Sequence, residues 1–439
     1  MRDLAGKRVA VVGMAKSGIA AVELLFEKGA RVIALDQKPV TDARLKAYGV
    51  VVLPQVPAAI AGIDLMVLSP GVPADAEIAQ GARASGAKVI GDLELASWFL
   101  QGNIIGITGA NGKTTTTAMT GHILQSAGIP VQVGGNIGTP PASMVATSRA
   151  DQWNVLELSS FQLETSDTFH ARIGAALNVT PDHLDRHHTF ENYAAAKGKL
   201  FTNQTAADFA VLNADDATAR AYKSAAQVHW FSALAQVERG AFVQSGKILL
   251  DGEPLMQTSE VPLRGSHNIE NAMAAAVMAK LAGAGNAQIR AAVMSFPGVE
   301  HRIEFTGTLN GVEWFNDSKA TNVDATLKAI AAFDGGLWII LGGKDKGSNY
   351  APLTTALRGK AEGVLLIGSA AEKIAGQLDG LPLQHCGTLE TAVREAHARA
   401  QRGHTVLLAP ACASFDQFDG YEHRGREFKR LAAALGVTR

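Results

Sequence analysis

Gly106-Ile107-Thr108-Gly109-Ala110-Asn111-Gly112-Lys113-Thr114 forms a glycine-rich turn between two segments with different apolar patterns. The β-branched run 104–108 is typical of a buried strand, and residues 114–125 are typical of a helix. Glycines let backbone N–H groups converge on phosphate oxygens, the lysine adds positive charge, and the threonine hydroxyl can bind Mg²⁺. The sequence therefore predicts a site for a nucleoside triphosphate.

The turn departs from the general phosphate-loop pattern G-x-x-x-x-G-K-[ST], because the first glycine of that pattern would fall on Ile107. Its spacing is T-G-x-N-G-K-T instead, which resembles the loop of the ATP-dependent Mur ligase and folylpolyglutamate synthase superfamily. The resemblance implies that ATP is bound by the loop residues Gly109, Asn111, Gly112, Lys113, Thr114 and Thr115.

Composition excludes several classes of protein. Hydrophobic residues make up 47% of the 439-residue chain, and a net charge of −1 gives no electrostatic reason to expect nucleic acid or an anionic membrane. The two cysteines, Cys386 and Cys412, fit a reducing compartment. No apolar run approaches the roughly 20 residues of a membrane span. The first residues, Met1-Arg2-Asp3-Leu4, lack the basic and apolar pattern of a secretory leader, so we expect none. We expect a cytoplasmic monomer without membrane insertion.

The chain is long enough for about three domains. Residues 1–95 alternate helix-like stretches such as 19–28 with short apolar runs, which predicts βαβ crossovers and a parallel sheet. The predicted strands of this first segment are residues 8–12, 31–35, 65–68 and 88–90. We predict a Rossmann-like domain that binds the first substrate.

Two further segments complete an α/β fold. Residues 96–297 predict a central P-loop ATPase-like domain, with strands at 155–158 and 175–179 and irregular or antiparallel structure at 225–260. Residues 298–439 predict a second Rossmann-like domain that binds an amino acid. Its buried strands are expected at 338–341, 363–367 and 405–408. The glycine- and proline-containing segments 100–102 and 296–298 are candidate hinges.

Gly13-Met14-Ala15-Lys16-Ser17-Gly18 follows the first predicted strand and opens a helix. It approximates the dinucleotide fingerprint, but the Cβ of Ala15 hinders the approach of a pyrophosphate and disfavours an NAD-dependent dehydrogenase. The turn can bind a nucleotide diphosphate at the helix N-terminus, with Asp36 accepting a hydrogen bond from ribose or uracil. Ser69-Pro70-Gly71 follows the third strand at the same sheet edge. Glycines that serve turn geometry alone remain an alternative.

The middle segment carries candidate metal ligands. Glu157 ends a predicted strand and can share a Mg²⁺ with Thr114. His183 lies in a polar cluster after the next strand, which favours a functional role over a structural one. By its chemistry alone, Lys197 is typical of a solvated helix residue. Asn268 and Asn271 precede a predicted helix at 272–282, where Asn268 can cap the helix or either side chain can contact adenine.

Several motifs spread over this segment look like those of a Mur ligase: the phosphate loop, 134–138, 156–162, 178–185 and His-Asn-x-x-Asn at 267–271. In that family the lysine matching Lys197 is carbamylated and becomes an oxygen ligand of a second Mg²⁺ beside His183. The resemblance implies two Mg²⁺ ions held by Thr114, Glu157, His183 and Lys197. It implies that a UDP-linked substrate contacts Ala15, Lys16, Asp36, Ser69, Gly71, Asn136, Ser159 and Gln162.

The last segment carries groups for phosphate and for an acidic amino acid. Arg302 and Lys319 can stabilise developing phosphate charge, and Asp317 can contact the nucleotide ribose. An amino acid with two carboxylates could be bound by the basic side chain of Lys346 and the hydroxyls of Thr321 and Ser414. Lys346 as a solvated turn residue is the alternative.

Within the family, Ser414-Phe415-Asp416-Gln417-Phe418 resembles the members that add D-glutamate to UDP-N-acetylmuramoyl-L-alanine, and the Asp-Asn-Pro-Arg motif of a sister ligase does not occur. Tyr421 stands where the family often has phenylalanine and can place a hydroxyl near the D-glutamate site. The resemblance implies an acyl-phosphate mechanism with Lys113, His183, Lys197 and Lys319 as catalytic residues. A sister Mur-type or folylpolyglutamate-type ligase and an ATP-gated binding protein remain alternatives.

Overall fold

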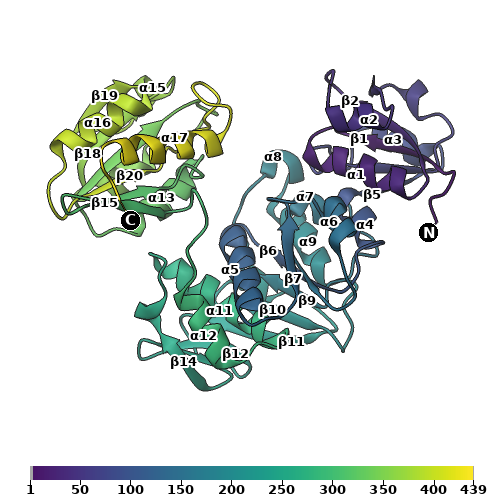
Figure 1. Ribbon diagram of the computed structural model, residues 1–439, viewed down its shortest axis with the longest axis horizontal. Helices are drawn as coiled ribbons and strands as arrows, with labels where there is room; N and C mark the ends of the chain where they lie inside the picture. The colour runs from purple at the N-terminus through teal and green to yellow at the C-terminus, as the bar shows by residue number, and fades with distance from the viewer. Residues whose placement is uncertain (1–2, 439) are drawn as a thin grey trace. The chain divides into compact units, whose positions relative to one another are not determined.

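The computed structural model describes residues 3–438 (Figure 1). The chain divides into two compact units. The first unit extends to Pro262 and resumes at His267–Phe296, and the second comprises Leu263–Ser266 and continues from Pro297. The division after Phe296 lies inside the candidate hinge 296–298. The predicted limits of the individual domains at 95 and 297 stay predictions.

The first unit begins with a five-stranded parallel sheet in the order β3-β2-β1-β4-β5. The strand order reverses direction between β1 and β4, which places the turns after these two strands beside the crevice where open α/β sheets bind ligands. The strands are β1 (Arg8–Val12), β2 (Arg31–Asp36), β3 (Val52–Pro54), β4 (Leu65–Leu68) and β5 (Lys88–Gly91). The helices are α1 (Lys16–Glu27), α2 (Ala43–Ala47), α3 (Glu77–Ala84) and α4 (Asp92–Ser97).

A nine-stranded sheet follows in the same unit, in the order β14-β13-β12-β11-β10-β9-β6-β8-β7. Every pairing from β7 to β12 is parallel, and the β12-β13-β14 end is antiparallel, as predicted for part of 225–260. Its strands are β6 (Asn103–Thr108), β7 (Val131–Gly135), β8 (Trp153–Glu157), β9 (Ile173–Ala176), β10 (Phe209–Asn213), β11 (Gln227–Ser232), β12 (Gly240–Gln244), β13 (Lys247–Leu250) and β14 (Glu253–Gln257).

The helices of this part of the unit lie around that sheet (Figure 1). They are α5 (Lys113–Ser126), α6 (Pro141–Met144), α7 (Ser160–Glu164), α8 (Leu184–His187), α9 (Phe190–Gly198), α10 (Ala217–Arg220), α11 (Ser266–Leu281) and α12 (Asn286–Met294).

Two predicted boundaries in this part are wrong. The strand predicted at 175–179 ends at Ala176, because Asn178 bonds to the turn after β6: its carbonyl accepts from the Ala110 N–H and its side chain accepts from the Asn111 N–H. The helix predicted at 272–282 begins at Ser266, because Asn268 and Asn271 pack their polar side chains against each other within its first turns. Apolar periodicity does not detect a polar helix start.

The second unit contains a six-stranded sheet in the order β15-β16-β20-β17-β18-β19, parallel except for the β15–β16 pair. Its strands are β15 (Glu304–Leu309), β16 (Val312–Asn316), β17 (Leu337–Gly342), β18 (Ala361–Ile367), β19 (Leu383–Gly387) and β20 (Thr405–Leu408). Its helices are α13 (Val323–Ala331), α14 (Pro352–Leu357), α15 (Ala371–Ala375), α16 (Leu389–Arg399) and α17 (Tyr421–Ala434), the last drawn in yellow in Figure 1.

Both faces of the six-stranded sheet are covered. Ile339 and Leu341 pack with residues of α13 and α14, whereas Trp338 and Ile340 pack with residues of α16 and α17. Alternate residues of a strand point to opposite faces, so one buried run such as 337–342 builds two cores. The α/β fold class is therefore confirmed, with a P-loop sheet that lies between two Rossmann-like sheets in the sequence.

Arg264 belongs to the second unit although it precedes α11 in the sequence. Its guanidinium bonds to Glu313 and lies over the rings of Phe315 and Phe333, at 5.0 and 5.3 Å from their centroids. Cation–π contacts of this kind add to the ion pair in holding the short segment 263–266 on the unit.

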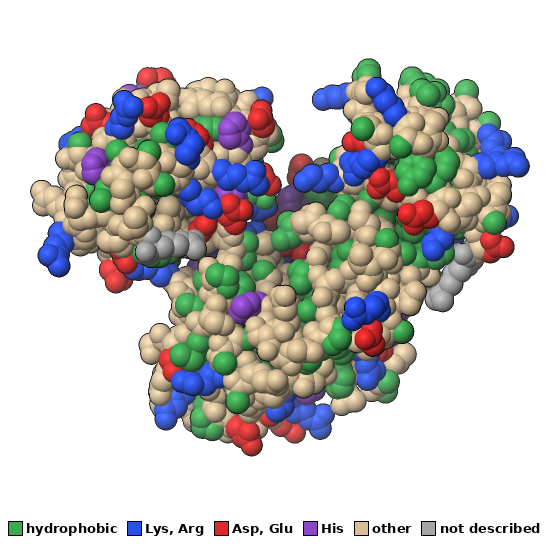
Figure 2. Space-filling model, viewed as in Figure 1, with side chains coloured by type: hydrophobic (Ala, Val, Ile, Leu, Met, Phe, Trp, Pro, Cys, Tyr) green, Lys and Arg blue, Asp and Glu red, His purple; other side chains and the backbone are tan. Residues whose placement is uncertain are grey.

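Charged side chains of both signs are interspersed on the face shown in Figure 2. Among residues 3–438, no helix combines the length and the apolarity that crossing a membrane requires.

Candidate active site

The predicted phosphate loop connects β6 to α5, as expected. Lys113 folds back so that its ammonium donates to the carbonyls of Gly109 at 2.9 Å and Ala110 at 3.0 Å. Asn178, which follows β9, fastens the loop: its side-chain oxygen accepts from the backbone N–H of Asn111 at 2.8 Å, and its amide donates to the Asn111 carbonyl. These contacts fix the loop backbone at the start of α5, where helix N–H groups favour phosphate.

Gly112 is required at the end of the loop. It has φ of 83°, and a Cβ added there would lie 2.3 Å from Oδ1 of Asn271. That same oxygen accepts a hydrogen bond from the Thr116 hydroxyl at 3.1 Å, and Asn271 donates to Asn268 at 3.0 Å. Both asparagines predicted to contact ATP are buried beside the loop.

Three predicted residues meet at the carboxyl ends of β6, β7 and β8. The Thr114 hydroxyl donates to Glu157 at 2.8 Å, and the Asn136 amide donates to the other carboxylate oxygen at 3.1 Å. Glu157 is only 2% exposed. Hydroxyl and carboxylate oxygens are ligands that Mg²⁺ prefers, so this pair fits one Mg²⁺ beside the loop. Within residues 3–438 no group of three His, Cys, Asp or Glu side chains has metal-binding geometry.

Lys197 on α9 is 1% exposed, so interpreting it as a solvated helix residue is wrong. Its ammonium donates to the Gly109 carbonyl at 2.7 Å and lies 4.6 Å from the centroid of the Tyr193 ring. Burial, together with the nearby charge of Lys113, lowers the pKa of Lys197 well below its usual value, although Asp182 and Glu157 oppose the shift. Burial and a neighbouring cation both favour the neutral, nucleophilic amine over the ammonium form.

His183 precedes α8 in a left-handed conformation with φ of 53°. Its ring packs on Phe161 at 4.8 Å between centroids and lies 6.4 Å from Tyr193, whose ring contacts Lys197. The exposed imidazole is therefore on the Lys197 side of the loop. His187 is buried instead and bonds to Ser160 at 2.9 Å, in agreement with a local structural role.

A cavity of about 530 Å³ lies beside the turns after β1 and β4. Most residues predicted to contact the UDP-linked substrate line it: Ala15, Lys16, Asp36, Ser69, Gly71 and Asn136. Asp36 and Ser69 also order the first turn, because Asp36 accepts from the Met14 N–H at 2.7 Å and the Ser69 hydroxyl donates to the Gly13 carbonyl at 2.6 Å.

The other two predicted substrate contacts lie elsewhere. Ser159 and Gln162 are absent from the described lining of this cavity and form the capping box at the start of α7. Gln37 and Gln55 line the cavity but were not predicted. Gln37 directly follows β2, and Gln55 directly follows β3. Residues just after parallel strands often bind ligands, so this position could have identified both glutamines as candidates.

The predicted acceptor residues lie at one sheet edge in the second unit. Thr321, Lys346 and Ser414 follow β16, β17 and β20, which are neighbours in the sheet. Ser414 is buried, and Lys346 is exposed. Asp317, at the same edge, is buried, and burial raises its pKa to about 7 against the lowering effects of Arg302 and the Ile303 N–H.

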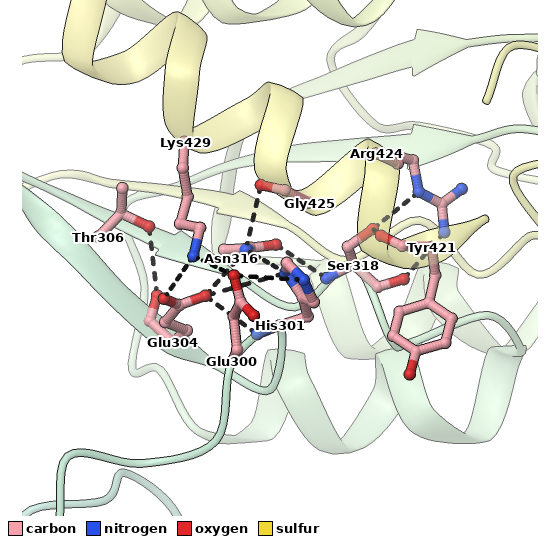
Figure 3. Close-up of polar contacts among 10 residues, drawn as sticks. All are labelled: Glu300, His301, Glu304, Thr306, Asn316, Ser318, Tyr421, Arg424, Gly425 and Lys429. Atoms are coloured by element: carbon pink, nitrogen blue, oxygen red, sulfur yellow. Dashed lines mark hydrogen bonds and ion pairs between the residues drawn. The ribbon is translucent and has the colours of Figure 1, made fainter. Parts of the chain in front are cut away.

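Arg424 joins two loops at this edge and was not predicted. Its buried guanidinium donates to the Ser318 hydroxyl at 3.0 Å and the Ser318 carbonyl at 2.9 Å (Figure 3). It also donates to the Cys412 carbonyl at 3.2 Å. Burial lowers the pKa of Arg424 to about 10, although Cys412 and Asp416 oppose the shift. An arginine satisfied by distant carbonyls leaves no local pattern in the sequence.

Figure 3 shows a second polar cluster behind this loop. Asn316 donates to His301 at 2.9 Å and to Glu304 at 3.0 Å, and it accepts from the Ser318 N–H at 3.1 Å. Lys429 on α17 donates to Glu304 at 3.0 Å. These contacts fix the backbone that leads into Lys319.

Family models match most of the chain. The models described as "Mur ligase MurD-like, N-terminal domain", "Mur ligase middle domain" and "Mur ligase, glutamate ligase domain" match residues 7–91, 107–279 and 301–412. The chain belongs to the Mur ligase family.

Relatives of this Mur ligase match along its whole length. A protein of Solibacter usitatus named UDP-N-acetylmuramoylalanine–D-glutamate ligase is 58% identical over 98% of this chain and 99% of its own. One of the same name from Myxococcus xanthus is 47% identical, with coverages of 98% and 99%. The solved UDP-N-acetylmuramate–alanine ligase of Thermotoga maritima shares the fold, with a TM-score of 0.64 at 18% identity over 98% and 99% of the two chains.

Membership of the family has direct consequences for the chemistry. A Mur ligase is an ATP-dependent enzyme that forms an amide bond, and it requires ATP and Mg²⁺. In this Mur ligase, the loop 106–114 and the Thr114–Glu157 pair fit those two requirements.

Proposed function

We propose that this Mur ligase joins D-glutamate to UDP-N-acetylmuramoyl-L-alanine with cleavage of ATP to ADP and phosphate. The observation that carries the proposal is the 47–58% identity, over essentially the full chain, to relatives named for that reaction. The acceptor edge of the second unit supports it independently, since it presents one basic side chain and two hydroxyls.

The uridine diphosphate would bind in the cavity beside β1 and β4. The N-terminus of α1 offers backbone N–H groups and the positive end of the helix dipole, and Lys16 adds a positive charge. Asp36, which already holds the turn through the Met14 N–H, would accept from the uracil or ribose. Ser159 and Gln162 would contact the part of the substrate that leaves this cavity.

ATP would place its phosphates on the loop 109–115, with Asn268 and Asn271 near the base. Arg302 and Asp317 are further proposed ATP ligands. Thr114 and Glu157 would hold one Mg²⁺, which supplies charge neutralisation on the transferring phosphoryl group. Lys113 would release the Gly109 and Ala110 carbonyls and bind phosphate oxygens instead.

In the first step, a carboxylate oxygen of the alanyl residue attacks the γ-phosphorus, and ADP leaves. The product is an acyl phosphate. In the second step the amine of D-glutamate attacks the acyl carbon, loses a proton and expels inorganic phosphate. Lys113 and Lys319 would stabilise the negative charge that develops on phosphate oxygens.

We also propose that Lys197 is carbamylated. Its neutral amine would attack the carbon of CO₂ and lose a proton, which converts a buried cation into an anionic oxygen donor beside His183. The burial of Lys197, the lowered pKa and the proximity of Lys113 support this, because a carbamate would relieve the repulsion between two ammonium groups. The oxygen atoms would provide a second Mg²⁺ site.

The two carboxylates of D-glutamate would bind to Lys346, Thr321 and Ser414. All proposed ligands of each substrate come from one chain, so we propose that the protein acts as a monomer. We propose the cytoplasm as its location, because ATP and UDP-linked sugars occur there. Sedimentation of the substrate-bound protein tests the monomer.

The reaction itself is tested by phosphate release from ATP and Mg²⁺ in the presence of UDP-N-acetylmuramoyl-L-alanine. D-glutamate, L-glutamate, D-aspartate and L-lysine are offered separately. We expect release only with D-glutamate, together with a product heavier by one glutamyl residue. Release with a different amino acid would assign a sister activity, and release without any acceptor would contradict amide formation.

A further inference from the structure

Lys319 and Tyr421 form a close pair at the acceptor edge. The Lys319 ammonium donates to the Tyr421 hydroxyl at 2.7 Å and lies 4.1 Å from the centroid of the Tyr421 ring. Lys319 is in the loop after β16, and Tyr421 is the first residue of α17, more than a hundred residues later. Both side chains are half-buried.

The backbones of both partners are fixed. The Ser318 hydroxyl donates to the Tyr421 carbonyl at 2.8 Å, Arg424 donates to the Ser318 hydroxyl and carbonyl, and the Lys319 N–H donates to the His301 carbonyl at 3.2 Å. Figure 3 shows the Tyr421 ring directed away from the Glu304–Lys429 pair. The remaining freedom at this point is the long side chain of Lys319, whose rotamers carry considerable entropy.

A carboxyl adjoins the pair in the sequence. Partial burial acts to raise the pKa of Glu422, but its own backbone N–H, the neighbouring Tyr421 side chain and the charge of Lys319 together lower it. The Tyr421 hydroxyl oxygen accepts from the Lys319 ammonium, and this bond sets the orientation of the two groups toward each other.

We propose that the Tyr421 hydroxyl is a positioning group that holds the Lys319 ammonium in one rotamer, and that it acts through Lys319 without binding the amino acid itself. The kinetic part of this inference rests on the proposed function. Phenylalanine at 421 would keep the ring under the ammonium and remove only the oxygen, so Tyr421→Phe isolates the hydroxyl.

The kinetic test compares Tyr421→Phe with a control, Tyr48→Phe. The control removes a hydroxyl from an exposed tyrosine that follows α2, beside the five-stranded sheet. For Tyr421→Phe we expect kcat to fall about tenfold, with KM for ATP and for the UDP-linked substrate within about twofold. Tyr48→Phe should match the unchanged protein. A raised KM for D-glutamate at unchanged kcat would overturn the proposal, because the hydroxyl would then bind the amino acid directly.

The same substitution is repeated in a Lys319→Gln background. If Tyr421 acts through Lys319, its hydroxyl should have less than about a twofold effect on the residual rate there. A tenfold fall in that background as well would show that the hydroxyl acts independently of Lys319 and would overturn the proposal.

Thermal unfolding tests the pair without any assumption about the reaction. The decreases in Tm for Tyr421→Phe and Lys319→Gln should be non-additive in the double variant, because both remove the same contact. Additive decreases would overturn the proposed pairing. If the unchanged protein shows no D-glutamate-dependent phosphate release while the Tm values are non-additive, the proposed function fails and the positioning of Lys319 stands.

Discussion

Lys113 and Lys197 donate to the same backbone oxygen, the carbonyl of Gly109, at 2.9 and 2.7 Å. Two ammonium groups on one carbonyl repel each other, and the shared contact is part of the reason why the pKa of Lys197 is lowered. The arrangement becomes electrostatically more favourable when one of the two groups loses its charge or when anionic phosphate oxygens lie beside them.

Replacing Lys197 by alanine should therefore abolish most of the activity. We expect kcat to fall by at least about 100-fold, because a proposed oxygen donor is lost from a closed site. Short carboxylates such as formate or acetate should restore part of the rate by supplying an oxygen ligand. Lys199→Ala, two residues away and exposed, is the matched control and should retain activity. Absence of any rescue would argue against a carbamate at Lys197.

Glu157 should control the requirement for Mg²⁺. Glu157→Gln keeps the shape of the side chain and removes its charge, so the Mg²⁺ concentration for half-maximal phosphate release should rise by about tenfold or more. The control is Glu191→Gln on the exposed side of α9. An unchanged Mg²⁺ dependence in Glu157→Gln would remove Glu157 from the set of metal ligands.

Alanine variants at Gly112 and Gly128 separate the effect of a clash with Asn271 from the effect of backbone strain. Both have positive φ, 83° and 75°, but a Cβ meets Asn271 at 2.3 Å in the first case and has nothing within 4 Å in the second. Gly128→Ala should cost about 1 kcal/mol of stability and leave ATP binding intact. Gly112→Ala should weaken ATP binding, measured by calorimetry, by far more than its loss of stability explains. Equal ATP affinity in the two variants would contradict the packing of Asn271 on the loop.

Asp92 makes stability depend on pH. It is 1% exposed, and among the described residues its carboxylate oxygens have no hydrogen-bond partner. Burial raises its pKa from 3.8 to about 6, and the electrostatic influence of the nearby polar groups of Leu93, Gln162 and Ser17 offsets only part of this shift. Between these two pH values the folded protein holds a proton that the unfolded chain has lost, so the carboxyl contributes less stability as pH rises through this window.

Asp92→Asn should remove that dependence. Relative to the unchanged protein, the variant should gain stability from about pH 4 to pH 6, up to about 3 kcal/mol above pH 6, and should show no gain at pH 4. Tm measured across this range checks the prediction, with the exposed Asp75→Asn as the control. A gain that is equal at pH 4 and pH 7 would show that packing, and not ionisation, is responsible.

The sequence predicted those parts of the fold whose signal is local. Strands β1, β4 and β20 match their predicted bounds because each is a short, buried apolar run. The phosphate loop was equally predictable, since its function requires particular residue types at consecutive positions. Thr114, Asn136 and Glu157 lie together because β6, β7 and β8 are parallel, so their carboxyl ends lie at one edge of the sheet.

Features that depend on distant polar contacts were not predictable. The first turns of α11 are polar because they pack on the loop at Gly112, and β9 ends early because Asn178 bonds to Asn111. Arg424 is an arginine in an amphipathic helix, and only the folded chain shows that it bonds to carbonyls more than ten residues and more than a hundred residues away. Such contacts have no period in the sequence.

The placement of Arg264 affects how the protein can be divided for study. A fragment that starts at Pro297 would leave Glu313 and the rings of Phe315 and Phe333 without the guanidinium that covers them, and a fragment that starts early enough to include Arg264 must also carry α11 and α12. No continuous piece of the chain therefore reproduces the second unit by itself. To keep these contacts, a fragment of the second unit would need the segment 263–266 supplied separately. A circular permutation that joins this segment to the unit, or a short peptide added in trans, would supply it.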